Sequence, residues 1–367
     1  MKITAIDLWH VPLTSHETYY MAEGKTCATT TSVILRLTTD TGNSGWGEVC
    51  PIPHYLPAFA DGVEPIIDHL APLLLGADPV GPEALMHRLD AHLPDHRYAK
   101  SAIDMALWDL TAQAANLPLH ALLGGRQARD MPTYHSITCV APEEMARIAT
   151  EAHASGIRQF QAKLGVDANW EADVARLRKV REAVGPGPLV YGDWNCGADV
   201  LSAIRVARGV ADIDVMLEQP CRTIEECTQV AQATGLPMKL DENVHDTASL
   251  MQAQAAGCLQ AVALKLSKMG GLSRMRQLRD LCVHFGTRMC IEDTWGSDIA
   301  TACALHLAAA TPPRVLLNVC DLSGYVAPRL DPNAPARRNG RIAPPNGPGL
   351  GVAPDLDTLG PPRARFH

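Results

Sequence analysis

Three carboxylic acids end short apolar runs in the middle of the chain, and a lysine stands on either side of them. Asp193 ends Val-Tyr-Gly-Asp, Glu218 ends Met-Leu-Glu and Asp241 ends Met-Lys-Leu-Asp, with gaps of 25 and 23 residues. Lys163 and Lys265 lie about one such interval before and after the acids. Side chains at matching ends of successive parallel strands meet at one mouth, so this spacing predicts a shared site.

The three acids have the chemistry of a metal site. Carboxylates this close cannot all stay ionised without a cation. Hard oxygen ligands that leave room for water and a bidentate ligand suit octahedral Mg²⁺ better than zinc. We therefore predict one Mg²⁺ per subunit, held by Asp193, Glu218 and Asp241. The alternative is that each acid caps the helix after its strand, which the common register of all three disfavours.

The two lysines are predicted to move a proton. A lysine beside Mg²⁺ and a second ammonium group has its charged form disfavoured, so its pKa falls toward neutrality. It can then take a proton from carbon. Either lysine taken alone is better explained as a surface or ion-paired residue. Because they flank three acids, Lys163 and Lys265 are predicted to be the catalytic pair.

The elements that position these residues follow a strand–helix alternation that starts after residue 130. Amphipathic segments such as 169–183 and 198–209 separate short apolar runs. Such alternation predicts a parallel sheet, and eight units predict a closed barrel whose active site lies at the C-terminal strand ends. The candidate strands are 132–139, 159–164, 188–193, 214–218, 237–241, 261–266, 288–293 and 315–320.

The first 130 residues have a different pattern. We expect strands at 1–13 and 31–39 and a third from Gly45, which form an antiparallel meander with loops at 14–30 and 51–62. A helical period follows from about 63 to 123. The tail is rich in Pro and Gly and is expected to fold back onto the meander. The predicted domains are an α+β cap, 1–128 completed by 325–367, and a barrel, 129–324.

Composition narrows the class of protein. A net charge of −8 without a basic run argues against nucleic acid as the main partner. Eleven scattered cysteines with no Cys-x-x-Cys suggest free thiols in a reducing compartment. No apolar stretch approaches the roughly 20 residues of a membrane span, and the first residues lack a signal-peptide core. We expect a soluble, cytoplasmic protein without a membrane partner.

Taken together, the motifs resemble those of the enolase superfamily, in its mandelate racemase and muconate lactonizing enzyme branch. The resemblance implies an α/β fold, a (β/α)₇β-type modified TIM barrel with an α+β capping domain. It also implies α-proton abstraction through an enediolate, bases on opposite faces of the substrate carbon, and a homo-oligomer. The motifs that carry it are Gly45-Trp-Gly-Glu48, Ser101-Ala-Ile-Asp-Met-Ala-Leu-Trp-Asp109, Leu122-Leu-Gly-Gly125, Asp193-x-Asn195, Glu218-Gln-Pro220, Asp241-Glu242, Gly270-Gly271 and Gly347-Pro-Gly-Leu-Gly351.

This chain departs from the family pattern at one position. The family commonly has Lys-x-Lys on the second barrel strand, and the first position here is Gln161. One neighbouring cation is thereby lost, so the metal must lower the pKa of Lys163. Asn195 and Glu242 are expected beside the metal ligands.

Substrate choice, by the resemblance, lies in two capping loops and the last strand ends. Related members epimerise proline betaines or dehydrate cis-3-hydroxy-L-proline. The betaine members place a Trp at the end of the last strand; here Cys320 stands at that position and Asp321 follows it. A carboxylate suits an ammonium with N–H donors, whereas a quaternary cation favours aromatic faces. The expected pocket residues are Tyr20, Lys25, His54, Tyr55, Asp293, Thr294, Trp295 and Asp321.

We therefore predict a small imino acid as substrate. The expected reaction is dehydration of cis-3-hydroxy-L-proline to Δ1-pyrroline-2-carboxylate by the Lys/Lys pair. The alternative is 2-epimerisation of proline betaine or hydroxyproline betaine. A remote alternative is a metal-binding barrel without catalysis, which the intact lysine pair and acids disfavour.

Overall fold

The N-terminal meander is an antiparallel sheet whose first two strands form a long hairpin. The computed structural model describes residues 1–53, 57–167 and 169–367. In it, β1 (Ile3–Tyr20), β2 (Thr26–Thr39) and β3 (Ser44–Val49) pair in sequence order. The meander expected from the sequence is therefore present, with longer strands.

The segment 14–30, expected to be a loop, is the outer half of this hairpin. β1 and β2 pair at Thr14↔Thr29 and again at Tyr19↔Cys27 and Tyr20↔Thr26, and the turn contains a 3₁₀ helix, η1 (Ala22–Gly24). The register shifts between Thr14 and Tyr19. Such a shift breaks the two-residue alternation by which a strand is recognised, which explains the wrong expectation.

The cap also contains helices that pack on the sheet and enclose a second hydrophobic core. β3 packs closely against α3 at Gly47. A Cβ placed on Gly47 would lie 1.8 Å from the carbonyl oxygen of Ala102, so only glycine fits there. These helical elements are η2 (Ala60–Gly62), α1 (Val63–Leu74), α2 (Pro82–His92), α3 (Arg97–Ala114) and α4 (Leu119–Leu122).

After residue 130 the chain forms eight parallel strands in sequential order, as the alternation predicted. A parallel bridge between Thr133 and Val319 joins the two ends of the sheet, so the barrel closes. The strands are β5 (His135–Ile137), β6 (Gln159–Lys163), β7 (Leu189–Asp193), β8 (Met216–Glu218), β9 (Met238–Leu240), β10 (Ala261–Lys265), β11 (Arg288–Glu292) and β12 (Leu316–Val319).

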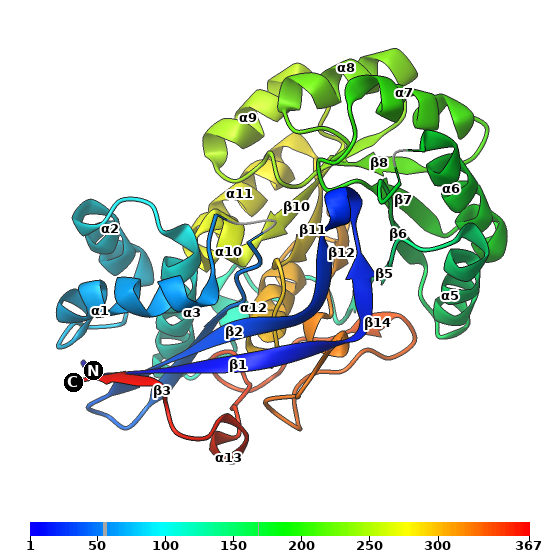
Figure 1. The fold of residues 1–367 in the computed structure, drawn as a ribbon. Helices are drawn as coiled ribbons and strands as arrows, with labels where there is room; N and C mark the ends of the chain where they lie inside the picture. Colours follow the sequence, from blue (N-terminus) through cyan, green and yellow to red (C-terminus); the bar gives the residue numbers. More distant parts are fainter. Residues whose placement is uncertain (54–56, 168) are drawn as a thin grey trace.

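Helices cover the outside of the barrel and alternate with the strands (Figure 1). The last strand, β12, is followed by the 3₁₀ turn η3 (Leu322–Gly324), which gives the (β/α)₇β pattern. Within the described ranges, no helix is long and apolar enough to cross a membrane. The barrel helices are α5 (Pro142–Ala154), α6 (Trp170–Val184), α7 (Val200–Gly209), α8 (Ile224–Thr234), α9 (Thr247–Ala256), α10 (Leu266–Met269), α11 (Leu272–Phe285) and α12 (Asp298–Ala309).

The C-terminal tail returns to the cap. β13 (Val326–Ala327) and β15 (Ala364–Phe366) both pair with β1, and the N- and C-terminal ends lie together (Figure 1). The tail also contains β14 (Arg341–Ile342), which pairs with β4 (Met131–Pro132), and the short helix α13 (Leu356–Leu359). The domain boundaries at 128 and 325 stay a prediction.

Buried carboxylates join the cap to the barrel. Glu48 of β3 accepts hydrogen bonds from the Ser297 backbone N–H at 2.7 Å and from its hydroxyl at 2.8 Å, at the start of α12. Asp104 of α3 accepts from the Ser273 backbone and hydroxyl at 2.8 and 2.6 Å, at the start of α11. A carboxylate at a helix N-terminus is favourable. Two motifs noted in the sequence thus fix the cap on the barrel.

Candidate active site

The three acids lie on neighbouring strands at the mouth of the barrel. Asp193 ends β7, Glu218 ends β8, and Asp241 directly follows β9. Asp193 and Glu218 are register partners in the parallel ladder. All three side chains are buried. The sequence therefore predicted their common location, while their function as metal ligands stays a prediction.

Both oxygens of each carboxylate are engaged. Asp193 receives the Lys163 ammonium at 2.5 Å and the Asn195 N–H at 2.9 Å. Asp241 receives Lys265 at 2.6 Å. The remaining contacts are those of Asp241 with Lys268 at 2.7 Å, and of Glu218 with Lys239 and Gln161 at 2.8 Å each.

Two of these cations, Lys239 and Lys268, were not expected from the sequence. The Lys239 side chain has no exposed surface, and its Nζ lies 2.8 Å from Oε1 of Glu218, an ion pair without aligned hydrogen-bond geometry. Nζ also lies 4.7 Å from the ring centroid of Tyr191. Lys239 stands two residues before Asp241, and alternation along a strand places both on the inner face. That spacing was the available signal.

The carboxylates repel one another. Burial, and then the charges of Asp193 and Asp241, raise the pKa of Glu218 to about 7, against the effect of Lys239. Burial and the same two aspartates raise the pKa of Glu242 to about 8. For Asp241, burial raises the pKa but Lys265 and Lys268 outweigh it, so the pKa is lowered. Glu218 and Glu242 therefore bind protons more tightly than isolated carboxylates do, and a bound cation would relieve this repulsion.

The donor set fits one divalent cation. Among the described residues of the mouth, six carboxylates face four ammonium groups, an excess of two negative charges when all are ionised. Within 1–53, 57–167 and 169–367, no three acid, Cys or His side chains are arranged to chelate an ion as they stand, because the acids contact lysines. The carboxylates are Asp193, Glu218, Asp241, Glu242, Glu292 and Asp293, and the ammonium groups are Lys163, Lys239, Lys265 and Lys268.

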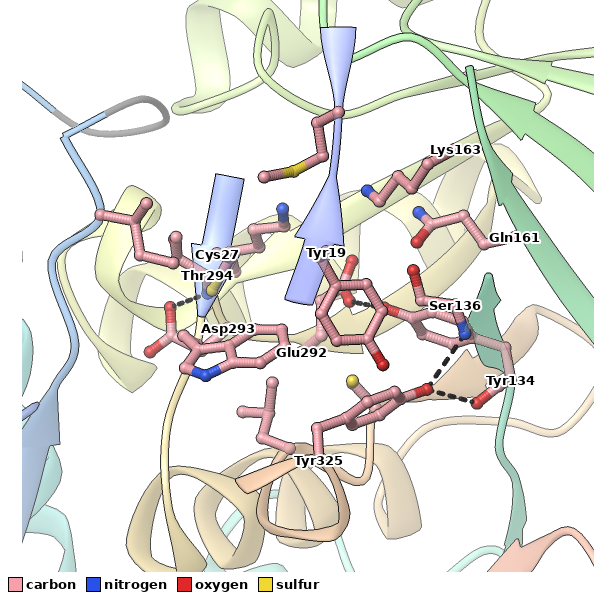
Figure 2. A pocket seen from close by; sticks show the side chains of 16 residues that line it. Tyr19, Cys27, Tyr134, Ser136, Gln161, Lys163, Glu292, Asp293, Thr294 and Tyr325 are labelled. Carbon is pink, nitrogen blue, oxygen red and sulfur yellow. Dashed lines mark hydrogen bonds between the residues drawn. The ribbon is translucent and has the colours of Figure 1, made fainter. Parts of the chain in front are cut away.

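A cavity adjoins these acids, because both predicted catalytic lysines, which contact Asp193 and Asp241, line it; Figure 2 shows Lys163 among its lining residues. Its wall combines aromatic rings with a few polar groups. Glu292 accepts the Tyr134 hydroxyl at 2.5 Å, and the Tyr325 hydroxyl accepts the Ser136 N–H at 3.1 Å. The other described lining residues are Tyr19, Met21, Cys27, Ile52, Gln161, Asp293, Thr294, Trp295, Cys320 and Leu322.

Three aromatic side chains of the wall contact one another. The Tyr19 ring meets Trp295 and Tyr325 edge to face, with centroids 5.7 and 6.0 Å apart. Trp295 and Tyr325 are 5.9 Å apart. These separations are those of rings in direct contact. The rings therefore close one side of the cavity rather than enclose a space between them.

The predicted pocket residues are only partly brought together. Asp293, Thr294 and Trp295 line the cavity. Tyr20 is 45% exposed and lies outside the lining, and its neighbour Tyr19 lies inside. Alternation along β1 explains why the adjacent tyrosine takes the inner position.

Lys25 and Asp321 also lie away from the lining. Lys25 pairs with Glu23 at 2.9 Å and donates to the Asn195 carbonyl at 3.3 Å, which ties the hairpin tip to the loop after β7. Asp321 is buried, but its neighbours Cys320 and Leu322 line the cavity instead. The expected contact of Asp321 with a substrate ammonium is therefore not supported. His54 and Tyr55 lie outside the described residues.

The residues expected beside the metal ligands are near them. Gln161 donates to Glu218 at 2.8 Å. Asn195 accepts from Lys163 at 3.2 Å and donates to Glu242 at 3.1 Å. Three lining residues were not predicted from the sequence: Tyr19 of the hairpin, Tyr134 before β5 and Glu292 at the end of β11. Glu292 is in register with Lys265 on the adjacent strand, which was the available signal for it.

Comparison with known proteins agrees with this architecture. Residues 4–124 match the family described as mandelate racemase / muconate lactonizing enzyme, N-terminal domain, and residues 144–358 match the enolase C-terminal domain-like family. A cis-3-hydroxy-L-proline dehydratase from Roseibium aggregatum is 39% identical over 368 residues, with 100% of both chains covered. An L-Ala-D/L-Glu epimerase from Bacillus subtilis is 30% identical and covers 84% of this chain and 86% of its own.

Solved structures from Roseovarius nubinhibens ISM are similar over the whole chain. A mandelate racemase/muconate lactonizing enzyme superposes with a TM-score of 0.94 at 35% identity, covering 100% of this chain and 98% of its own. A member of the enolase superfamily complexed with magnesium gives a TM-score of 0.94 at 37% identity, covering 100% and 99%.

Proposed function

The chain belongs to the mandelate racemase / muconate lactonizing enzyme family of the enolase superfamily, and from this premise we propose that it dehydrates cis-3-hydroxy-L-proline. The product is Δ1-pyrroline-2-carboxylate. The relative from Roseibium aggregatum carries this activity in its name, and its identity extends over the whole chain. We assign proton transfer to Lys163 and Lys265, and Mg²⁺ binding to Asp193, Glu218 and Asp241.

One observation carries the proposal: both lysines line a single cavity on either side of the three acids. Lys163 ends β6 and Lys265 ends β10, and β7, β8 and β9 with their acids lie between. In an eight-stranded barrel, strands four positions apart face each other. A substrate carbon in the cavity is thus approached from opposite faces.

Opposite faces are what this reaction requires. In cis-3-hydroxy-L-proline the hydroxyl and the carboxylate share one face of the ring, so the α-hydrogen is on the other. One lysine, neutral, takes the α-proton as the C–H bond breaks. The second lysine, protonated, gives a proton to the departing hydroxyl, which leaves as water. The resulting enamine tautomerises to the imine by moving a proton to carbon.

The residues around the lysines orient the acids and exclude water. Asp193, Glu218 and Asp241 would hold Mg²⁺, which would supply positive charge against the negative charge that develops on the substrate carboxylate. Gln161 and Lys239 hold Glu218 in its orientation, and Asn195 contacts Lys163. The aromatic wall and the hairpin tip exclude water, which strengthens these electrostatic contacts. General acid–base catalysis of this kind contributes about 10²–10⁴-fold to a rate.

The aromatic wall favours a second candidate reaction, 2-epimerisation of a proline betaine. The faces of Tyr19, Trp295 and Tyr325 could attract a quaternary ammonium. Against this, the three rings contact one another and leave no room for a cation between them. A barrel without catalysis would not need both lysines in the cavity. We therefore retain the dehydratase.

The decisive experiment is incubation with Mg²⁺ in D₂O, followed by NMR. With cis-3-hydroxy-L-proline we expect loss of the hydroxyl and appearance of the pyrroline. Proline betaine is the comparison substrate. Deuterium at Cα with inversion of the betaine, and no dehydration, would favour the epimerase. Absence of exchange with every imino acid and betaine would contradict the substrate class but not the family.

A further inference from the structure

The strand order divides the cavity into two halves. The acids assigned to the metal end β7 and β8 or follow β9, and the two lysines stand at the borders, on β6 and β10. The other half consists of β11, β12 and β5. A substrate that directs its carboxylate to the acids and its α-carbon to the lysines must extend its amine and ring into this second half.

In the second half, Glu292 is a buried acid on the inner face of the barrel. It ends β11, is 3% exposed, and lines the cavity with Tyr134 and Ser136 (Figure 2). Glu292 and Lys265 are register partners on adjacent strands. The carboxylate is therefore next to the lysine that we place at the α-carbon, where an α-amino group would lie.

Glu292 is held in place and keeps capacity for a further donor. The Tyr134 hydroxyl donates to Oε2 at 2.5 Å. A carboxylate accepts about four hydrogen bonds, so one tyrosine does not saturate it. The Tyr134 side chain is buried beside Lys239, whose Nζ is 5.7 Å from its ring centroid. Glu292 thus has a fixed position without losing its acceptor function.

The neighbouring acid, Asp293, holds a turn through one of its two oxygens. Oδ1 of Asp293 accepts the backbone N–H of Ser267 at 3.0 Å and that of Thr294 at 2.7 Å. Asp293 therefore anchors the turn directly after Lys265. Asp321, the other acid near this half, is not part of the lining. Oδ2 of Asp293 has no hydrogen-bond partner among the described residues, so Glu292 is distinguished from Asp293 by its register with Lys265 and its contact with Tyr134.

We propose that Glu292, held by Tyr134, receives the ring N–H of the substrate ammonium and so selects amino acids with a free N–H over fully methylated betaines. This inference rests on the proposed function and names the substrate class of the same site. A charge-assisted hydrogen bond needs an N–H donor, which a quaternary ammonium lacks. Its two methyl groups would also occupy the space in front of the carboxylate.

The test is a binding cycle between two proteins and two ligands, measured by calorimetry in Mg²⁺. The proteins are the wild type and Glu292→Gln, which keeps the shape and removes the charge. The ligands are L-proline and tetrahydrofuran-2-carboxylate, which has an ether oxygen in place of the N–H. We expect Glu292→Gln to weaken L-proline binding about 10- to 100-fold and to change binding of the ether analogue about 3-fold or less.

Further variants guard against a general loss of structure. Tyr134→Phe should weaken L-proline binding by a smaller factor, because it releases Glu292 without removing it. Glu182→Gln, at a 74% exposed side chain on α6, serves as the matched control and should bind like the wild type. Thermal melts of each variant establish that it is folded.

The outcomes separate the inference from the proposed function. Equal weakening of both ligands by Glu292→Gln would mean that Glu292 does not bind the amine, which overturns the inference. If the wild type dehydrates cis-3-hydroxy-L-proline while the variant binds L-proline unchanged, only the inference fails. If the wild type binds no imino acid, both fail.

Discussion

Lys239 and Glu218 form an ion pair in which neither side chain has any exposed surface. Burial lowers the pKa of Lys239, but the charge of Glu218, together with smaller effects of neighbours such as Tyr191 and Glu292, outweighs it and raises the pKa well above its usual value. From the sequence, glutamine in place of lysine at position 161 implied the loss of a neighbouring cation. The structure has a cation beside Gln161 after all, supplied by β9.

Removing one member of this pair should be costly. We expect Lys239→Met to lower the free energy of unfolding by about 3–5 kcal/mol, because it leaves the Glu218 charge buried and uncompensated. Urea denaturation measures this. The double variant Lys239→Met/Glu218→Gln should recover part of the loss. A Lys239→Met protein as stable as Lys179→Met, a half-exposed control on α6, would contradict the role given to the pair.

Each of the two cavity lysines should be essential for proton transfer on one face of the substrate α-carbon. Lys163→Ala and Lys265→Ala are expected to lower kcat/KM for dehydration by about 10²–10⁴-fold. Hydrogen–deuterium exchange at Cα, tested separately with L- and D-proline, should disappear for one enantiomer in each variant. Lys179→Ala should behave like the wild type. Unchanged exchange of both enantiomers in both variants would exclude the Lys/Lys mechanism.

The acids and lysines were predictable because each ends a short apolar run, and strand ends of a parallel barrel face one mouth. The pocket was less predictable. Tyr20 was chosen and Tyr19 is inside, since a strand without clear alternation does not reveal which of two neighbours faces in. Asp321 was chosen for its charge, yet Glu292 of β11 lines the cavity. Side-chain direction, rather than residue type, was the missing information.

At the scale of elements, glycine at position 47 permits the contact of β3 with α3. We expect Gly47→Ala to destabilise the protein severely or to prevent soluble expression, because its Cβ would overlap the Ala102 carbonyl. Gly62→Ala is the matched control. Its Cβ would have its nearest neighbour, the Phe59 ring, at 3.5 Å, so it should be tolerated. Thermal melts that do not distinguish the two variants would contradict this packing argument.

The carboxylate of β3 at the start of α12 should make stability depend on pH. Burial raises the pKa of Glu48 to about 7. The folded state therefore binds this proton more tightly than the unfolded state. The stabilisation from Glu48 is full below its unfolded pKa, near 4.5, and is lost as the pH rises through about 7.

Comparison with an uncharged residue isolates this effect. The difference in unfolding free energy between wild type and Glu48→Gln should shrink between pH 4.5 and 8, by roughly 3 kcal/mol at most. Denaturation of both proteins across this range measures it. At low pH the variant should be the less stable one, because its amide opposes the donors of Ser297. A constant or growing difference would contradict a buried, proton-binding Glu48.

At the scale of the whole molecule, Mg²⁺ should stabilise the fold. A ligand that binds only the folded state adds RT ln(1 + [L]/Kd), about 2.7 kcal/mol at a hundredfold excess over Kd. We expect the melting temperature to rise with added Mg²⁺ and to fall with chelator. Asp193→Asn should reduce the rise. An equal response of wild type and variant would place the ion elsewhere.

The barrel was predictable as a whole because strand–helix alternation is a local pattern repeated eight times. The hairpin tip was not, because the register shift between Thr14 and Tyr19 breaks its alternation. The return of the tail to the meander was expected, but its register was not, because that pairing joins residues far apart in sequence. Ile6 pairs with Phe366, for example, and nothing near either residue encodes that register. The homo-oligomer suggested by the resemblance stays a prediction, which light scattering tests directly.

The pairing of β15 with β1 sets an order of assembly during synthesis. Every barrel strand lies earlier in the chain than Ala364–Phe366, so the ribosome presents a complete barrel before the edge of β1 gains this partner. Until then, Ile6–Leu8 expose unpaired backbone groups that another nascent chain could capture. Residues made late, Ala364–Phe366, thus protect residues made early. A chain shortened by four residues should therefore aggregate during expression although its catalytic residues are intact.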